Sequence, residues 1–281
     1  MRDSRRLVPA VVVAVAVAFL GAVFVPRMLS GRDASPAPAA PTLADFFGPQ
    51  VRLRDKGAFG GGQVLEKTPG RSMDVLRVDY PRNSVSPSAT RSYGAPLGGM
   101  QVYLPLADGP VDEAYLRYWV RFQPGFEFAR GGKLPGLYGG TKVSGGKKPD
   151  GTDGLSTRLM WRSGGRGEVY LYARDRAGDS LGRGDWTFRP GRWTCVQQHV
   201  RLNHPGDENG LVSVRIDGHE VFSDGSIEYR TTEDLHVDGI FFSTFFGGHE
   251  PKWASPQDQH TDFAGFELST DHRVGCGQAP S

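Results

Sequence analysis

The sequence predicts an all-β protein, an antiparallel two-sheet β-sandwich of the lectin-like jelly-roll type, preceded by an N-terminal apolar helix. Beyond Val51, apolar and polar residues alternate with a period of two, in short runs bounded by glycine, proline, asparagine and aspartate. The chain has 281 residues, with 39 glycines and 20 prolines, which suits one all-β domain of roughly 200 to 250 residues. No long amphipathic helix is visible, and the lack of an internal repeat argues against a propeller or solenoid.

The N-terminus predicts a membrane helix. Residues 1–6 contain three arginines and precede Leu7–Val25, an uncharged run of mainly alanine, valine, leucine and phenylalanine. This run exceeds the about 7 to 15 apolar residues of a signal peptide and reaches the about 17 to 25 that span a bilayer. We expect a signal anchor with residues 1–6 in the cytoplasm and the bulk of the chain outside. Cleavage after the run is the alternative, so the protein is expected to be extracytoplasmic, either membrane-anchored or secreted.

A Pro/Ala-rich linker at residues 26–42 separates this helix from a folded domain expected at 43–281. The two cysteines, Cys195 and Cys276, are expected to form a disulfide that ties the C-terminal tail to an internal strand. The seven histidines are scattered, without H-x-H or H-E-x-x-H spacing. We therefore expect neither a metal site nor a cofactor.

The charge pattern limits the class of partner. The net charge is +2, and the charged residues are interspersed rather than gathered in a basic tail. This pattern lacks the electrostatic signature of nucleic-acid binding, so no nucleic-acid partner is expected. A local excess of basic residues would still suit an acidic ligand. We expect the protein to be a monomer.

Runs of β-branched and aromatic residues locate the expected strands. Within Leu211–Phe222, apolar residues alternate with polar ones, which indicates a half-buried strand. Asp217 and Gly218 then supply the residue pair that two-residue hairpin turns prefer. The expected strands are Ala114–Phe122, Thr157–Trp161, Val169–Ala173, Cys195–Leu202 and Leu211–Ile216.

The hairpin Leu155–Arg174 carries the most informative polar face. A turn centred on Gly165 sets Arg162 opposite Glu168, a favourable cross-strand ion pair. By alternation, one face of the hairpin is apolar and belongs to the core, while the other collects a hydroxyl, a guanidinium and two phenols. Such groups suit the floor of a saccharide groove. The core face carries Leu159, Trp161, Val169 and Leu171, and the polar face carries Ser156, Arg158, Met160, Tyr170 and Tyr172.

A glycine-rich segment, Phe126–Gly140, holds a single cation, Lys133, between glycine pairs. It shows no regular apolar stripe, so it is not expected to contribute to the core. Glycine lets a ligand approach the backbone closely. We expect the segment to place Lys133 over the polar face of the hairpin, with glycines that leave room for a polymer.

Four motifs resemble one enzyme family. GGKLPGL, STRLMWR, YLY and FFSTFFGGHEPKW, in this order, are similar to the alginate lyases of polysaccharide lyase family 14 and to the related glucuronan lyases of family 20. The resemblance extends over most of Phe46–Leu268. It implies a jelly roll whose concave sheet binds an acidic polysaccharide. It also implies catalytic roles at the positions that match the family's lysine, arginine and tyrosine pair, Lys133, Arg158, Tyr170 and Tyr172, and places the family's serine at Ser156.

The implied chemistry requires these residue types. A lyase removes the proton on C5 of a uronate, next to the carboxylate, and expels the oxygen on C4. A cation must stabilise the charge that develops on the carboxylate, and Arg158 and Lys133 can supply it. Tyr172 or Lys133 is the expected base, and Tyr170 or Tyr172 the expected acid.

Four residues are expected to bind substrate: Ser156, Met160, His249 and Trp253. Ser156 is not a nucleophile, because the chain has no G-x-S-x-G elbow. His249 follows the FFGG sequence and is expected at the groove rim. Trp253 either stacks on a sugar or covers the sandwich edge, and the phenylalanines before it are expected in the core.

Two other functions remain open at this point. A glycoside hydrolase on a similar sandwich would need two carboxylates flanking the bond, and no E-x-D-x-E strand motif is present. A non-catalytic polysaccharide-binding protein of the cell envelope could keep the same fold without the reaction. The set formed by Lys133, Arg158 and the two tyrosines favours the lyase.

Overall fold

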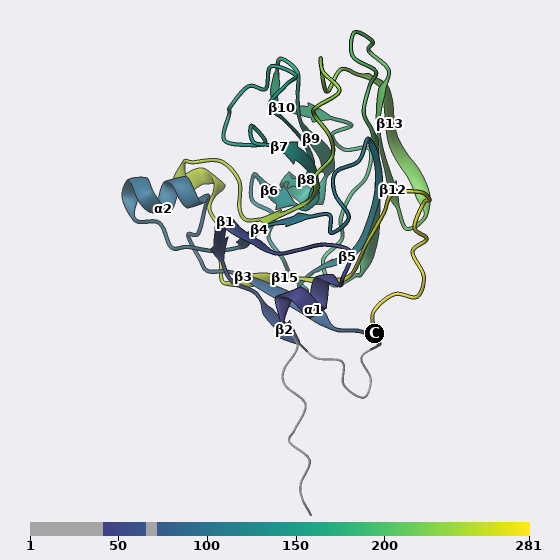
Figure 1. Ribbon diagram of the computed structural model, residues 1–281. Helices are drawn as coiled ribbons and strands as arrows, with labels where there is room; N and C mark the ends of the chain where they lie inside the picture. The colour runs from purple at the N-terminus through teal and green to yellow at the C-terminus, as the bar shows by residue number, and fades with distance from the viewer. Residues whose placement is uncertain (1–41, 66–71) are drawn as a thin grey trace, which may run out of the picture. The chain divides into compact units, whose positions relative to one another are not determined.

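The computed structural model describes residues 42–65 and 72–281 (Figure 1). The predicted membrane helix at 7–25 and almost all of the linker lie outside these residues. Within the described ranges, no helix is both long and apolar enough to cross a bilayer. The first described element is the short helix α1, which begins at Leu43 and is capped by the Thr42 side chain.

The described residues form two antiparallel sheets. One sheet has the strand order β1-β4-β14-β7-β8-β9-β10, with β6 paired to β8, and the other has the order β13-β12-β11-β5-β15-β3-β2. The strands of the first sheet are β1 (Arg54–Gly60), β4 (Met100–Pro105), β6 (Gly131–Leu134), β7 (Gly136–Gly140), β8 (Gly154–Arg162), β9 (Gly167–Ala173), β10 (Arg176–Leu181) and β14 (Gly239–Thr244). Those of the second sheet are β2 (Gln63–Leu65), β3 (Val75–Tyr80), β5 (Glu113–Phe122), β11 (Thr194–Arg201), β12 (Gly210–Ile216), β13 (His219–Ile227) and β15 (Gln259–Ser269).

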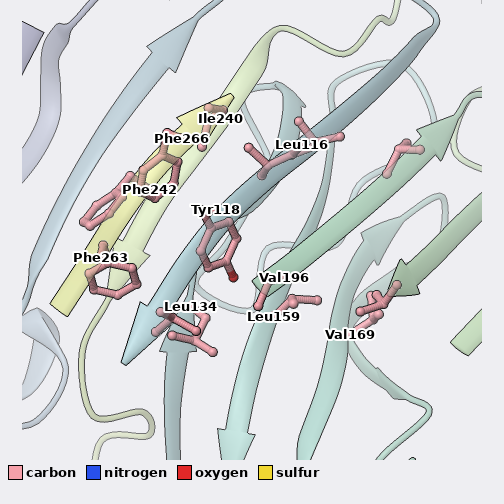
Figure 2. Packing of buried hydrophobic residues seen from close by; sticks show 14 of the residues in the cluster. Leu116, Tyr118, Leu134, Leu159, Val169, Val196, Ile240, Phe242, Phe263 and Phe266 are labelled. Carbon is pink, nitrogen blue, oxygen red and sulfur yellow. The ribbon is translucent and has the colours of Figure 1, made fainter. Parts of the chain in front are cut away.

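The core lies between the two sheets, which confirms the predicted sandwich. Both sheets contribute alternate apolar side chains to one large buried cluster. Figure 2 shows part of it, where Phe242 of the first sheet lies beside Phe263 and Phe266 of the second. The Tyr118 and Phe266 rings stack with centroids 5.1 Å apart. The side chains on the outer face of the first sheet are therefore not part of this core.

Helices play a small part, as the sequence predicts. Besides α1 (Leu43–Phe47), the described residues contain α2 (Pro87–Tyr93) and two single turns of 3₁₀ helix, Ser163–Gly165 and Pro251–Trp253. All five predicted strands are present, as β5, β8, β9, β11 and β12, with ends that shift by at most three residues. The turn between β12 and β13 has left-handed φ values of 51° at Asp217 and 85° at Gly218, which the predicted hairpin turn requires.

The predicted disulfide is present between Cys195 and Cys276. Its Cα atoms lie 5.9 Å apart, within the usual range for a disulfide. Cys195 is in β11, and Cys276 belongs to the tail that follows β15. The bond therefore attaches the C-terminal tail to the second sheet, on the side of the molecule that does not carry the polar hairpin face.

The predicted register of the 155–174 hairpin is wrong by two residues. Arg158 pairs with Tyr170, and Met160, not Arg162, pairs with Glu168. The ladder ends earlier than expected because the loop contains a 3₁₀ turn, in which two glycines adopt left-handed φ. A slip of two residues preserves both faces. Arg162 still forms an ion pair with Glu168, at 2.5 Å, across the diagonal.

The glycine-rich segment also differs from expectation. It forms β6 and β7, and its Leu134 and Leu137 are completely buried in the core. A Cβ atom at Gly132 would lie 2.0 Å from the Trp161 ring. The glycine at this position thus makes room for the protein's own packing, and not for a polymer.

Candidate active site

A groove of about 620 Å³ lies on the outer face of the first sheet. Its floor comes from β4, β6, β8 and β9, and its walls come from β1, α2 and the loops after β7 and β14. The lining residues include no aspartate or glutamate. They are Gly57, Ala58, Phe59, Ser86, Pro87, Ser88, Arg91, Gln101, Lys133, Ser144, Gly145, Gly146, Arg158, Tyr170, Tyr172, Phe245, Gly248 and His249.

Strand pairing brings the four predicted catalytic residues into this groove. Arg158 of β8 is paired with Tyr170 of β9, and Tyr172 lies two residues further on the same face. On the other side of β8, Lys133 of β6 is paired with Met160. Because side chains alternate along each strand, all of these residues project from the outer face of the sheet.

Lys133 carries a buried amine that forms no ion pair with an acidic side chain in the part of the chain that the structure describes. Its side chain is 8% exposed. Its Nζ atom lies 2.8 Å from Met160 Sδ and 3.1 Å from the centroid of the Tyr170 ring. Burial, followed by the positive charges of Arg158 and Arg162, holds the pKa of Lys133 well below its usual value. A neutral amine at this position can accept a proton.

Arg158 is a buried cation, at 2% exposure. The centre of its guanidinium lies 4.4 Å from the centroid of the Phe241 ring, and Nη1 donates a hydrogen bond to Ser243 Oγ at 3.2 Å. Its Nε is buried and has no hydrogen-bond partner among the described residues. Burial also lowers the pKa of Arg158, but an arginine remains charged at any physiological pH.

Lys133 and Arg158 form no ion pair with any described residue. A buried charge without a counterion costs much free energy, so natural proteins keep one mainly where function needs it. An anionic ligand in the groove would neutralise the charge of Arg158.

The two tyrosines differ in their surroundings. Their rings meet edge to face with centroids 5.6 Å apart. Burial, reinforced by the neighbouring Tyr172, raises the pKa of Tyr170 to about 12, so Tyr170 keeps its proton at neutral pH. Tyr172 is 1% exposed, and its hydroxyl accepts a hydrogen bond from the Gly146 amide at 3.0 Å. Tyr172 thus fastens the loop after β7 to the groove floor.

The predicted substrate-binding residues lie in different places. Ser156 is completely buried, and its hydroxyl donates to the Val143 carbonyl at 2.7 Å, so it anchors a loop and does not line the groove. Met160 lies beneath Lys133 at 2% exposure. His249 lies at the rim as expected. Trp253 packs against the small apolar cluster beside α2 and covers that edge of the fold.

The FFSTFF strand also differs from the expectation for its phenylalanines. Phe242 and Phe246 lie in the core, as expected. Phe241 instead lies on the outer face, where it supports Arg158, and Phe245 lines the groove. Both faces of β14 are covered, so the alternation that marks a half-buried strand is missing from its sequence.

Sequence reasoning missed several residues of the groove. Gln101 lines the floor from β4, and Arg91 of α2 lines one wall. The alternation in Met100–Pro105 does place Gln101 away from the core. Nothing local, however, indicates that β4 pairs with β14, which is more than 130 residues away in the sequence. Arg91 lies on a seven-residue helix whose sequence resembles a loop.

Comparisons with known proteins agree with this geometry. The family model described as polysaccharide lyase 14 matches residues 68–266. The solved PL-14 alginate lyase from Aplysia kurodai is 32% identical, with a TM-score of 0.65, over 76% of this chain and 89% of that chain. Comparison with curated protein sequences gave no match.

Two more distant structures show the fold alone. Alginate lyase vAL-1 from Chlorella virus is 22% identical, with a TM-score of 0.62, over 74% of this chain and 88% of that chain. The endo-β-1,4-glucuronan lyase from the fungus Trichoderma reesei is 12% identical, with a TM-score of 0.52, over 78% and 90% of the two chains. The family match and the Aplysia structure, in contrast, establish the family, and this chain belongs to polysaccharide lyase family 14.

Proposed function

We propose that this protein is an extracytoplasmic lyase that cleaves a uronic-acid polymer of the alginate type by β-elimination. The observation that carries the proposal is the buried Arg158 guanidinium next to the buried Lys133 amine, both of which line the groove without an acidic partner among the described residues. A polymer with one carboxylate on each sugar supplies the missing anion. The related structures named as alginate lyases support this substrate class. The basic and apolar N-terminal sequence and the disulfide support the extracytoplasmic setting.

The geometry supports a role for each group. The Arg158 guanidinium, which lines the groove, binds the uronate carboxylate and stabilises the charge that builds up there. Neutral Lys133 takes the proton from C5. The C5–H electron pair forms the C4–C5 double bond, and the C4–O bond breaks. Tyr170, which keeps its proton because burial raises its pKa to about 12, donates that proton to the departing oxygen.

The resting state is then restored by proton transfer to and from water. Elimination leaves an ammonium on Lys133 and a phenolate on Tyr170. The Lys133 Nζ lies over the face of the Tyr170 ring, 3.1 Å from its centroid and away from the hydroxyl. Lys133 therefore releases its proton to water, and Tyr170 regains one from water, once the product has left the groove.

The lining of the groove disfavours hydrolysis. A glycoside hydrolase commonly uses two carboxyl groups that flank the scissile bond. None of the residues that line the groove is acidic. Glu168, on the neighbouring part of the sheet, is fully buried and already bound to Arg162 and Arg183.

A panel of polymers tests this function. The soluble domain should be incubated with alginate, polyglucuronate and a neutral glucan, while ultraviolet absorbance and reducing ends are followed together. We expect both signals to rise with a uronate polymer and neither to rise with the glucan. New reducing ends without absorbance would indicate hydrolysis. Binding without either signal would indicate a non-catalytic polysaccharide-binding protein.

Two tyrosine variants test the identity of the acid. We expect Tyr170→Phe to lower kcat by about 100- to 10,000-fold, the range for loss of a general acid. Tyr172→Phe removes the acceptor for the Gly146 amide, so its main effect should be a higher KM through a loosened loop. Measuring kcat and KM for both variants separates these roles. A loss of kcat confined to Tyr172→Phe would transfer the acid role to Tyr172.

A further inference from the structure

Arg158 is held by a residue that the proposed mechanism does not use. Ser243 lies on β14 and is completely buried. Its Oγ accepts a hydrogen bond from Arg158 Nη1 at 3.2 Å and donates one to Gln101 Oε1 at 3.3 Å. Ser243 and Gln101 are directly paired between β14 and β4. One hydroxyl thus connects the buried arginine with a neighbouring strand.

The chain of hydrogen bonds continues to the wall of the groove. Gln101 Nε2 donates to the Gly57 carbonyl at 2.7 Å. Gly57 belongs to β1, has a left-handed φ of 85°, and lines the groove beside Gln101. The amide of Gln101 is therefore fixed at both ends, since its nitrogen donates to Gly57 and its oxygen faces Ser243.

This arrangement determines the direction of the Ser243 hydroxyl. A serine has one hydrogen to donate and lone pairs to accept with. Because the hydrogen is directed to Gln101, the lone pairs face Arg158 and can accept from Nη1. If Gln101 lacked its oxygen, the hydroxyl could rotate and direct its hydrogen at the guanidinium, which would repel it.

Arg158 is thereby restrained in two ways. The Phe241 ring at 4.4 Å sets the plane of the guanidinium, and the Ser243 hydrogen bond limits its rotation within that plane. The strand β7 lies between β14 and β8, and a side chain on it at this point would disturb the arrangement. β7 carries Gly136 here, where a Cβ would lie 2.5 Å from Arg158 Cα. The restraint fixes the guanidinium where Arg158 lines the groove.

We propose that Ser243 and Gln101 are positioning residues that orient the Arg158 guanidinium toward the uronate carboxylate. The inference rests on the proposed function, because it assigns Arg158 the task of stabilising the carboxylate. Orientation matters most when negative charge develops on the carboxylate during elimination. Loss of the restraint should therefore lower kcat more than it weakens binding.

A double-mutant cycle tests the proposal. The variants are Ser243→Ala, Gln101→Met and the double variant, each assayed for kcat and KM on alginate. We expect Ser243→Ala to lower kcat by about 10- to 100-fold, the usual effect of a hydrogen bond to a charged group, with KM changed less than about threefold. Gln101→Met should also lower kcat. The kcat of the double variant should lie within about threefold of the kcat of the less active single variant, because both residues act through one chain of contacts.

Thr244→Val serves as the matched control. Thr244 is the next residue of β14, is equally buried, and directs its hydroxyl into the core toward Tyr80. This variant should lose stability but keep kcat within about twofold of the wild-type value. Thermal unfolding of all variants confirms that the assays compare folded proteins.

The outcomes separate this inference from the proposed function. If the wild-type protein catalyses elimination but the effects of Ser243→Ala and Gln101→Met on kcat are additive, the inference alone is overturned. Additivity would indicate that Gln101 contacts substrate independently of Ser243. An equal loss of kcat in Thr244→Val would also overturn it, because the effect would then be general to β14. Absence of elimination by the wild-type protein would overturn the proposed function, and the inference with it.

Discussion

Replacing Lys133 with methionine should abolish elimination and at the same time stabilise the folded domain. Methionine has a similar length, no charge and no basic nitrogen, so it removes the proton acceptor with little change in packing. We expect kcat to fall by about 100- to 10,000-fold. We also expect the melting temperature to rise by about 2–4 °C, which corresponds to about 1 kcal/mol in a domain of this size.

The direction of the stability effect follows from the pKa. Burial lowers the pKa of Lys133 in the folded state, whereas the unfolded chain keeps the ordinary lysine value. At pH values between the folded-state and unfolded-state pKa of Lys133, the unfolded state binds more protons than the folded state. Lys133 therefore costs stability at neutral pH, and this cost shrinks as pH rises. The difference in melting temperature between Lys133→Met and the wild type should therefore narrow toward alkaline pH.

An exposed lysine provides the control for this experiment. Lys148 pairs with Asp175 at 3.4 Å, and both side chains are largely in solvent. Lys148→Met should leave kcat and melting temperature nearly unchanged, because exposed ion pairs contribute little. Substantial activity in Lys133→Met would contradict the role given to Lys133. So would a melting temperature below that of the wild type, with a difference between the two proteins that does not change as the pH rises.

Replacing Arg158 with lysine should lower kcat by about 100- to 1,000-fold, although the positive charge is kept. Lysine offers a point charge instead of the planar fork that binds a carboxylate, and it cannot place a guanidinium over the Phe241 ring as Arg158 does. The loss should appear mainly in kcat, because the carboxylate gains its extra charge only during the reaction. Steady-state kinetics on alginate at saturating concentration measures this effect.

Arg77→Lys controls for the general cost of replacing an arginine. Arg77 lies on the second sheet, where its Nε donates to Asp262 at 2.8 Å. This variant should lose stability but retain kcat. If Arg158→Lys kept more than about a tenth of the wild-type kcat, while Arg77→Lys behaved as expected, Arg158 could not be the main stabiliser of the carboxylate.

The polar face of the hairpin was predictable because it depends on local alternation alone. In every register that differs from the observed one by an even number of residues, one side of the hairpin carries Ser156, Arg158, Tyr170 and Tyr172. The register itself was not predictable, because the glycines of the loop permit several turn lengths. The position of Lys133 next to Tyr170 came from the family resemblance, not from periodicity.

The remaining part of the site depends on long-range pairing. Ser243 lies in a strand that is apolar on both faces, so its sequence does not show which side chains face outward. Its contact with Gln101 joins residues 142 positions apart. The glycines of β6 and β7 were misinterpreted for a similar reason, since the Trp161 ring that fills the space at Gly132 belongs to another strand.

The pH dependence of kcat/KM for the wild-type enzyme on alginate tests the central claim most directly. The uronate carboxylates stay ionised above about pH 5, so changes at higher pH report on the enzyme. The account predicts a rise as Lys133 loses its proton, with a midpoint well below the usual lysine pKa because burial lowers it. No fall should follow until the pH approaches the pKa of about 12 at which Tyr170 loses its proton. A kcat/KM that decreases with pH over this range would show that the reaction needs a protonated Lys133, and would contradict the assignment of Lys133 as the base.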